Sequence, residues 1–250
     1  MNHATTTHTG PLGSTIHCLR ADAETVKALA AIDWNRSFRR VCLDPVLGLV
    51  TLMAPSRLHE RLTEIVAQVV DAAGSAVTGA STGLRSTRLR GPADPPGTGM
   101  EPDCAFYVGE RARGYREAAM EGEAAADAFL ERTAPDLVVE VEITSVDEGK
   151  IERYGDLGVR ELWRLHGRKG TRDLQVDFLA LRPGMPPRPL AASALLGGLT
   201  DNDVCEAVDG VRFGMTPQER IDAVTRIVRR RQRAGVRVRE ADAPYAARSG

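Results

Sequence analysis

One short segment constrains the fold more than any other, because apolar and acidic residues alternate along it. Residues 137–143 read LVVEVEI, and successive side chains of a β-strand point to opposite faces of a sheet. One face of this strand is therefore apolar, and the other carries Glu140 and Glu142. Carboxylates within an otherwise apolar strand are costly to bury unless a cation lies close. The pattern predicts a strand near the centre of a sheet, with two acids on one face.

The segments around this strand predict an α/β fold. Apolar residues at helical spacing predict a long helix over residues 56–70, and a shorter helix is expected over 147–155, directly after the acidic strand. β-prone runs lie at residues 104–108, 159–165 and 174–181. Because strand, helix, strand and strand follow one another closely, we expect a compact α/β domain.

The rest of the chain predicts shorter elements and one further long helix. Thr216 and Glu219 match a helix start in which the two residues cap each other, with Pro217 in the first helical position. This helix is expected to finish in an arginine run. The other expected elements are a helix at 22–32, a hairpin at 38–50, one strand and a long loop within 74–99, a helix at 115–130 and a proline-rich stop after 181.

Length and composition bound the organisation. At 250 residues with 42% apolar content, the chain suits one large domain with frayed ends. We expect a disordered N-terminal tail at 1–20, a main domain at 21–200 and a C-terminal helical extension with a basic end at 201–250. No stretch approaches the roughly 18 apolar residues of a membrane span, so a cytoplasmic protein without membrane contact is expected. Four widely spaced cysteines indicate neither zinc nor disulfides, and 33 basic against 34 acidic residues leave nucleic-acid contacts to local patches.

A divalent ion is the chemistry that the acidic residues suggest. Hydrolysis of a phosphodiester needs a deprotonated water and stabilisation of negative charge, which a metal ion held by carboxylates supplies. Asp103 stands at the start of a β-prone run, and if that strand pairs with the acidic one, Asp103 and Glu140 could converge on one ion. The main-chain carbonyl of Val141 is a candidate third ligand. Lys150, on the following helix, could orient the attacking water or neutralise the scissile phosphate.

Each of these residues also has an ordinary structural interpretation. A Pro-Asp pair before a strand is common turn chemistry, and a Glu-x-Glu strand often forms a solvated face. A helical lysine such as Lys150 more often faces solvent. Spacing alone therefore leaves both interpretations open.

Two longer segments resemble a known family. Residues 86–108, STRLRGPADPPGTGMEPDCAFYV, and residues 135–167, PDLVVEVEITSVDEGKIERYGDLGVRELWRLHG, are similar to the core of the Uma2-type (DUF820) family of restriction endonucleases in the PD-(D/E)xK nuclease superfamily. In that family a PD before a strand, a second PD-led strand with a central glutamate, and a K-x-x-x-Y-x-x-x-G-V-x-E-x-W segment recur together. The last of these runs here from Lys150 to Trp163. The resemblance covers roughly residues 22–200.

The resemblance implies a restriction-endonuclease-like mixed β-sheet flanked by helices, which would make residues 21–200 a PD-(D/E)xK nuclease-like domain. It also implies that Asp103 and Glu140 bind magnesium or manganese. The superfamily's usual lysine position, two residues after the central acid, is Glu142 here, so Lys150 would act as a lysine displaced onto the next helix. Asp103, Glu140, Glu142 and Lys150 are accordingly the expected catalytic residues.

Other residues are weaker candidates for the same site. A further acid often completes such sites, and Asp44 or Glu60 could serve. His59 is a candidate proton shuttle, although it could equally cap or pack at its helix start. The aromatic pair Tyr154 and Trp163 is expected to fill the core.

DNA contact is expected from arginines near the loop before the first acid, namely Arg85, Arg88 and Arg90, and from the arginine-rich stretch 226–239. Both groups also have an ordinary structural interpretation, because a helix dipole favours cations at its C-terminus and runs of charged residues usually face solvent.

Two functions follow. The first is a cytoplasmic Mg²⁺- or Mn²⁺-dependent endonuclease acting on DNA, which a homodimer would suit because one site cuts one strand. The alternative is a catalytically inactive nuclease-fold module with a binding or regulatory role, suggested by the missing E-x-K lysine. Metal binding by Asp103 and Glu140 distinguishes them.

Overall fold

A six-stranded mixed sheet forms the centre of the computed structural model, which describes residues 5–9, 15–30, 40–54, 57–85, 87–91, 94–95, 98–142, 148–167, 174–212 and 215–233. The strand order is β10-β9-β8-β7-β6-β5. β7 pairs with β8 in parallel and with β6 in antiparallel orientation. The strands are β5 (Ser81–Arg85), β6 (Cys104–Val108), β7 (Leu137–Glu142), β8 (Glu161–Gly167), β9 (Leu174–Arg182) and β10 (Met185–Leu190).

The predicted alternation of β7 is confirmed, and it explains the central place of this strand. Leu137, Val139 and Val141 are buried in one hydrophobic cluster, whereas Val138 belongs to a second cluster on the opposite face. A strand buried on both faces needs apolar residues on both. Glu140 lies on the same face as Val138. Its buried carboxylate is the exception to the apolar pattern and needs polar partners from the rest of the fold.

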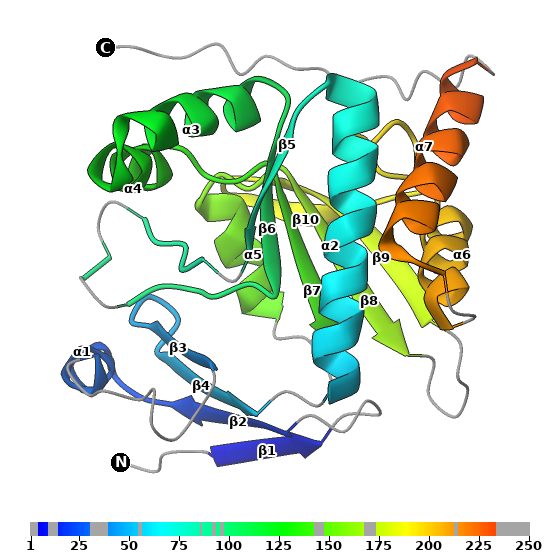
Figure 1. Cartoon of the computed structure of the whole chain (residues 1–250). Helices are drawn as coiled ribbons and strands as arrows, with labels where there is room; N and C mark the ends of the chain where they lie inside the picture. Colours follow the sequence, from blue (N-terminus) through cyan, green and yellow to red (C-terminus); the bar gives the residue numbers. More distant parts are fainter. Residues whose placement is uncertain are drawn as a thin grey trace.

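Helices cover both faces of the sheet (Figure 1). The helices α2 (Arg57–Thr78), α6 (Asp201–Arg212) and α7 (Pro217–Arg233) contribute to the cluster that contains Val139. The opposite cluster takes side chains from α3 (Glu110–Glu121), α4 (Glu123–Arg132) and α5 (Glu148–Asp156). The expected α/β class, a restriction-endonuclease-like mixed sheet flanked by helices, is confirmed.

A smaller antiparallel sheet precedes the main one and lies below it in Figure 1. Its order is β1-β2-β4-β3, with α1 (Ala23–Leu29) beside it. Its strands are β1 (Thr5–Thr9), β2 (Thr15–Arg20), β3 (Arg40–Asp44) and β4 (Leu49–Ala54). Within the helix expected over 22–32 and the hairpin expected over 38–50, α1 and the paired strands β3 and β4 are present, and residues 31–39 lie outside the described residues. The first two strands differ from the disordered tail expected over 1–20, because threonine and histidine give no apolar period although β-branched threonine pairs well in strands.

Three further comparisons refine the expected elements. The helix expected over 115–130 is two helices, because Gly122 has a φ of 134° that a continuous helix does not allow. The proline-rich stop is the edge strand β10, which pairs only with β9 and so tolerates prolines. The predicted cap of α7 is confirmed, since the amide of Thr216 donates to Glu219 at 2.7 Å and the amide of Glu219 donates to Thr216 Oγ1 at 3.3 Å.

Two other properties concern the described residues only. None of their helices is both long and apolar enough to cross a membrane. The described cysteine side chains Cys18, Cys104 and Cys205 take part in no disulfide bond, and Cys104 is buried.

Candidate active site

The register between β6 and β7 brings the two predicted acids together. Cys104 pairs with Val139 at the start of β6, and Asp103, the residue before Cys104, contacts the next part of β7 through the amide of Val141. Asp103 and Glu140 are both buried, with 3% and 6% of their surface exposed. Burial raises the pKa of Glu140, the ammonium of Lys150 lowers it, and the carboxylate of Asp103 raises it again. The sheet thus brings two mutually repelling acids together, and the ammonium of Lys150 offsets part of their repulsion.

Asp103 is fixed to two elements at once. Its Oδ2 accepts a hydrogen bond from the amide of Val141 at 2.6 Å, and His59 Nε2 lies 3.2 Å from the same oxygen. His59 stands near the start of α2 and is fully buried. The carboxylate is therefore held between strand β7 and helix α2. The sequence left open whether His59 approaches the acids, and the structure brings it to Asp103.

Glu140 binds two side chains of α5. Lys150 Nζ lies 2.7 Å from Glu140 Oε1, and the hydroxyl of Tyr154 donates to the same oxygen. Residues four apart share one face of a helix, so α5 directs both groups at β7. The ammonium also lies 5.7 Å from the centre of the Tyr154 ring. Lys150 does point back to the strand from the following helix.

Tyr154 is the residue whose contribution sequence reasoning missed. It is fully buried, as expected of a core aromatic, but its hydroxyl also contacts an acid of the site. A tyrosine four residues after the lysine on the same helix was the only available signal. The aromatic Trp163 packs in the core as expected, with its ring centre 5.0 Å from that of Phe178.

The motif's Glu-x-Trp pair serves the fold rather than the site. Trp163 Nε1 donates to the buried carboxylate of Glu161 at 2.7 Å. The same carboxylate accepts from the amides of Ala194 and Leu195 at 2.9 and 3.2 Å. Glu161 therefore ties the start of β8 to the segment that follows β10.

The second acid of the strand, Glu142, is placed by the structure through its backbone alone. Glu142 ends β7, where its backbone pairs with His166 of β8, but its side chain lies outside the described residues. On β8, His166 Nε2 lies 2.8 Å from Asp177 Oδ2. Val141, whose main-chain carbonyl is the candidate third ligand, is buried next to Glu140 in the strand and donates its amide to Asp103.

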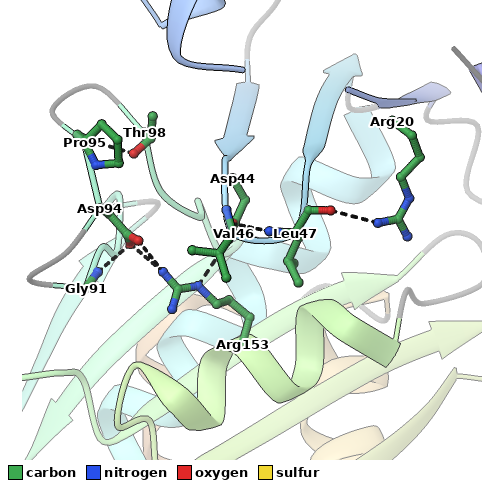
Figure 2. Close-up of polar contacts among 9 residues, drawn as sticks. All are labelled: Arg20, Asp44, Val46, Leu47, Gly91, Asp94, Pro95, Thr98 and Arg153. Atoms are coloured by element: carbon green, nitrogen blue, oxygen red, sulfur yellow. Dashed lines mark hydrogen bonds and ion pairs between the residues drawn. The ribbon is translucent and has the colours of Figure 1, made fainter. Parts of the chain in front are cut away.

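Of the two candidates for an extra acid, Asp44 has other partners. Its Oδ1 accepts from the amides of Val46 and Leu47 at 2.8 and 2.9 Å, and its Oδ2 lies 3.3 Å from Arg153 Nε (Figure 2). Glu60 follows His59 on α2 and is half-buried.

The three loop arginines differ in their ion pairs. Arg88 pairs with Glu101 at 2.6 Å, and Arg90 pairs with Glu131. Arg85 is exposed at the end of β5, with a positive φ of 54°.

The arginine-rich end of α7 lies far from the acids. Arg220 contacts Gln68 of α2, while Val77 and Val228 both lie against Gly197, so α2 and α7 run in the same direction. Arg229 to Arg233 therefore lie toward the end of α2 away from His59. That separation is about 27 Å, at about 1.5 Å of rise per residue between His59 and Val77. Residues 234–239 of the predicted patch lie outside the described residues.

The donor set fits a hard divalent cation. Mg²⁺ and Mn²⁺ prefer carboxylate, carbonyl and water oxygens, and often keep several waters. Asp103 and Glu140 supply two carboxylates whose repulsion a cation would relieve, and the carbonyl of Val141 is the candidate third oxygen. Within the described part of the chain, no three His, Cys, Asp or Glu side chains converge as metal ligands. Any ion here would depend on main-chain oxygen and water as well.

The fold is that of the restriction-endonuclease-like α/β class, a mixed sheet flanked by helices. Comparison with family models matches residues 40–176 to Uma2, described as "Putative restriction endonuclease". The match spans more than half of the chain, and the protein therefore belongs to the Uma2 family. No curated protein sequence matches it significantly.

Proposed function

We propose that this protein is a divalent-metal-dependent endonuclease that hydrolyses phosphodiester bonds of DNA. The observation that carries the proposal is the burial of Asp103 and Glu140 close enough to interact electrostatically, with Lys150 on the second acid at 2.7 Å. Buried carboxylates are costly unless a cation lies near them. Membership of a family described as restriction endonucleases supports the same activity and the same substrate.

Each residue has a distinct role in this proposal. Asp103, Glu140 and the carbonyl of Val141 would hold Mg²⁺ or Mn²⁺, which when bound supplies a deprotonated water and stabilises negative charge. Lys150 would orient the attacking water or neutralise the scissile phosphate from its place beside Glu140. Glu142 is proposed to assist at the end of the strand.

DNA is the proposed partner, and Arg85, Arg88 and Arg90 are the proposed phosphate contacts. Arg88 and Arg90 would exchange their glutamate partners for phosphate, whereas Arg85 has no ion pair among the described residues. A homodimer and a cytoplasmic location stay predictions.

The proposal is tested by incubating the purified protein with supercoiled plasmid and with single-stranded DNA in Mg²⁺ or Mn²⁺. Nicking that disappears with EDTA and in Asp103→Ala and Glu140→Ala supports the nuclease. A wild type that cuts nothing but binds DNA would favour the alternative of a non-catalytic binding module. That alternative is motivated by Glu142 standing where the superfamily has its lysine.

A further inference from the structure

A buried ion cluster lies beside the candidate site, centred on Arg153 of α5 (Figure 2). Its Nη2 lies 2.6 Å from both carboxylate oxygens of Asp94, and its Nε lies 3.3 Å from Asp44 Oδ2. The arginine side chain is 11% exposed, and the two aspartate side chains are 3% and 1% exposed. One cation therefore holds two acids almost out of contact with water.

Each acid of the cluster is fixed to its own piece of backbone. Asp44 caps the turn between β3 and β4, where it accepts from two amides. Asp94 accepts from the amide of Gly91 at 2.6 Å within the loop that precedes β6. The amide of Gly99, later in that loop, donates to the carbonyl of Leu43 at 2.7 Å. Arg153 thus joins three segments: the small sheet, the loop and α5.

Two of these segments lead directly to the acids of the site. Arg153 stands immediately before Tyr154 and three residues after Lys150, the two residues that bind Glu140. The loop that contains Asp94 ends at Asp103. The cluster therefore links the helix that serves one acid to the segment that delivers the other.

We propose that Arg153 is a positioning residue, which through Asp94 and Asp44 sets Lys150 and Tyr154 against Glu140. This inference rests on the proposed nuclease function, in which the ammonium of Lys150 must lie within reach of the reacting phosphate. A buried ion pair is often no more stabilising than well-packed apolar side chains. Its directional bonds do fix the rotation of α5 about its own axis, which apolar packing specifies less tightly.

The experiment is a double-mutant cycle on the rate of DNA cleavage, with Arg153→Ala, Lys150→Ala and the double variant. If Arg153 acts through Lys150, Arg153→Ala lowers kcat about 10- to 100-fold with KM within about 3-fold, and adds less than about 2-fold once Lys150 is absent. Multiplying effects would show that Arg153 does not act through Lys150 and would overturn the proposal.

Thr98→Val is the matched control, because it removes a hydrogen bond within the same loop, from the Thr98 hydroxyl to the carbonyl of Pro95 at 2.6 Å, and leaves the partners of Arg153 in place. It should leave kcat within about 2-fold of the wild type. Arg153→Lys, which keeps the charge but loses the planar guanidinium, should recover part of the rate. A Thr98→Val loss as large as that of Arg153→Ala would also overturn the proposal, because general loosening of the loop would then explain both.

Hydrogen exchange tests the proposal without depending on DNA cleavage or on a variant that could fail to fold. Asp94→Asn weakens the cluster without removing its bulk, and should speed amide exchange in residues 149–156 about 10-fold or more, whereas Thr98→Val should not. Unchanged exchange in α5 would contradict the positioning role. A wild type that cleaves no DNA would overturn the proposed function, while the exchange result would still decide whether this cluster holds α5 in place.

Discussion

Lys150 Nζ lies 2.7 Å from Glu140 Oε1, so a lysine on α5 reaches an acid in the middle of β7. The sequence places Glu142, rather than a lysine, two residues after Glu140 on the strand. The ammonium arrives instead from the helix that follows. The fold therefore delivers a lysine to the strand acid by a different route along the chain.

Replacing Lys150 should reduce DNA cleavage far more than it reduces DNA binding. Lys150→Ala removes the cation beside Glu140, and loss of one charge-stabilising group costs about 100-fold in rate. The check is the single-turnover cleavage rate in Mg²⁺. Lys27→Ala is the control, because Lys27 also forms an ion pair, with Glu24, but on the surface. Equal rates for Lys150→Ala and the wild type would remove this lysine from the mechanism.

Replacing Tyr154 by phenylalanine should destabilise the fold. The change deletes the hydroxyl that donates to the buried Glu140 and leaves the ring in place. Loss of a hydrogen bond to a buried carboxylate costs about 1–3 kcal/mol. Urea unfolding measures the change in the free energy of unfolding. Tyr115→Phe, at a half-buried position of α3, should stay within about 0.5 kcal/mol of the wild type. A similarly small loss in Tyr154→Phe would argue against the contact.

The stability of the protein should fall with rising pH through the titration of Glu161. Burial raises the pKa of this carboxyl above its usual 4.5, against hydrogen bonds from Ser193, Trp163 and two amides that lower it. The folded state then keeps a proton that the unfolded chain has lost, so the free energy of unfolding decreases as pH rises from 4.5 through the raised pKa. Below 4.5 both states are protonated and this loss is absent.

Glu161→Gln removes this titration. Urea unfolding at about pH 5 and about pH 8 should therefore show the wild type losing stability relative to the variant at the higher pH. A difference between the two proteins that does not change with pH, or that changes in the opposite direction, would contradict the raised pKa.

The sequence predicted the features that depend on local periodicity. Alternation in β7 predicted its two faces, and the reciprocal cap of Thr216 and Glu219 predicted the start of α7. The candidate acids Asp103 and Glu140 were chosen because each stands beside or within a strong strand signal, and the pairing of Cys104 with Val139 brings their two segments together.

The features that the sequence did not predict depend on contacts between distant residues. Arg153 is 59 residues from Asp94 and 109 from Asp44, so no local pattern links them. The sequence motif does not predict the hydrogen bond of the Tyr154 hydroxyl, because a tyrosine at this position also suits packing in the core. The sequence predicts a proline-rich stop where the structure has the edge strand β10. Prolines weaken any strand signal, but an edge strand pairs on one side and can therefore accommodate them.

Metal binding tests the central claim most directly. Calorimetric titration of Mn²⁺ into the wild type should show binding, and Asp103→Ala and Glu140→Ala should each abolish it while the far-ultraviolet circular dichroism stays that of a folded protein. The heat should be unchanged in Asp177→Ala, which removes an acid of β9 from the neighbouring His166 pair. A wild type that binds no Mn²⁺, or binding that survives in both carboxylate variants, would contradict a metal centre at Asp103 and Glu140.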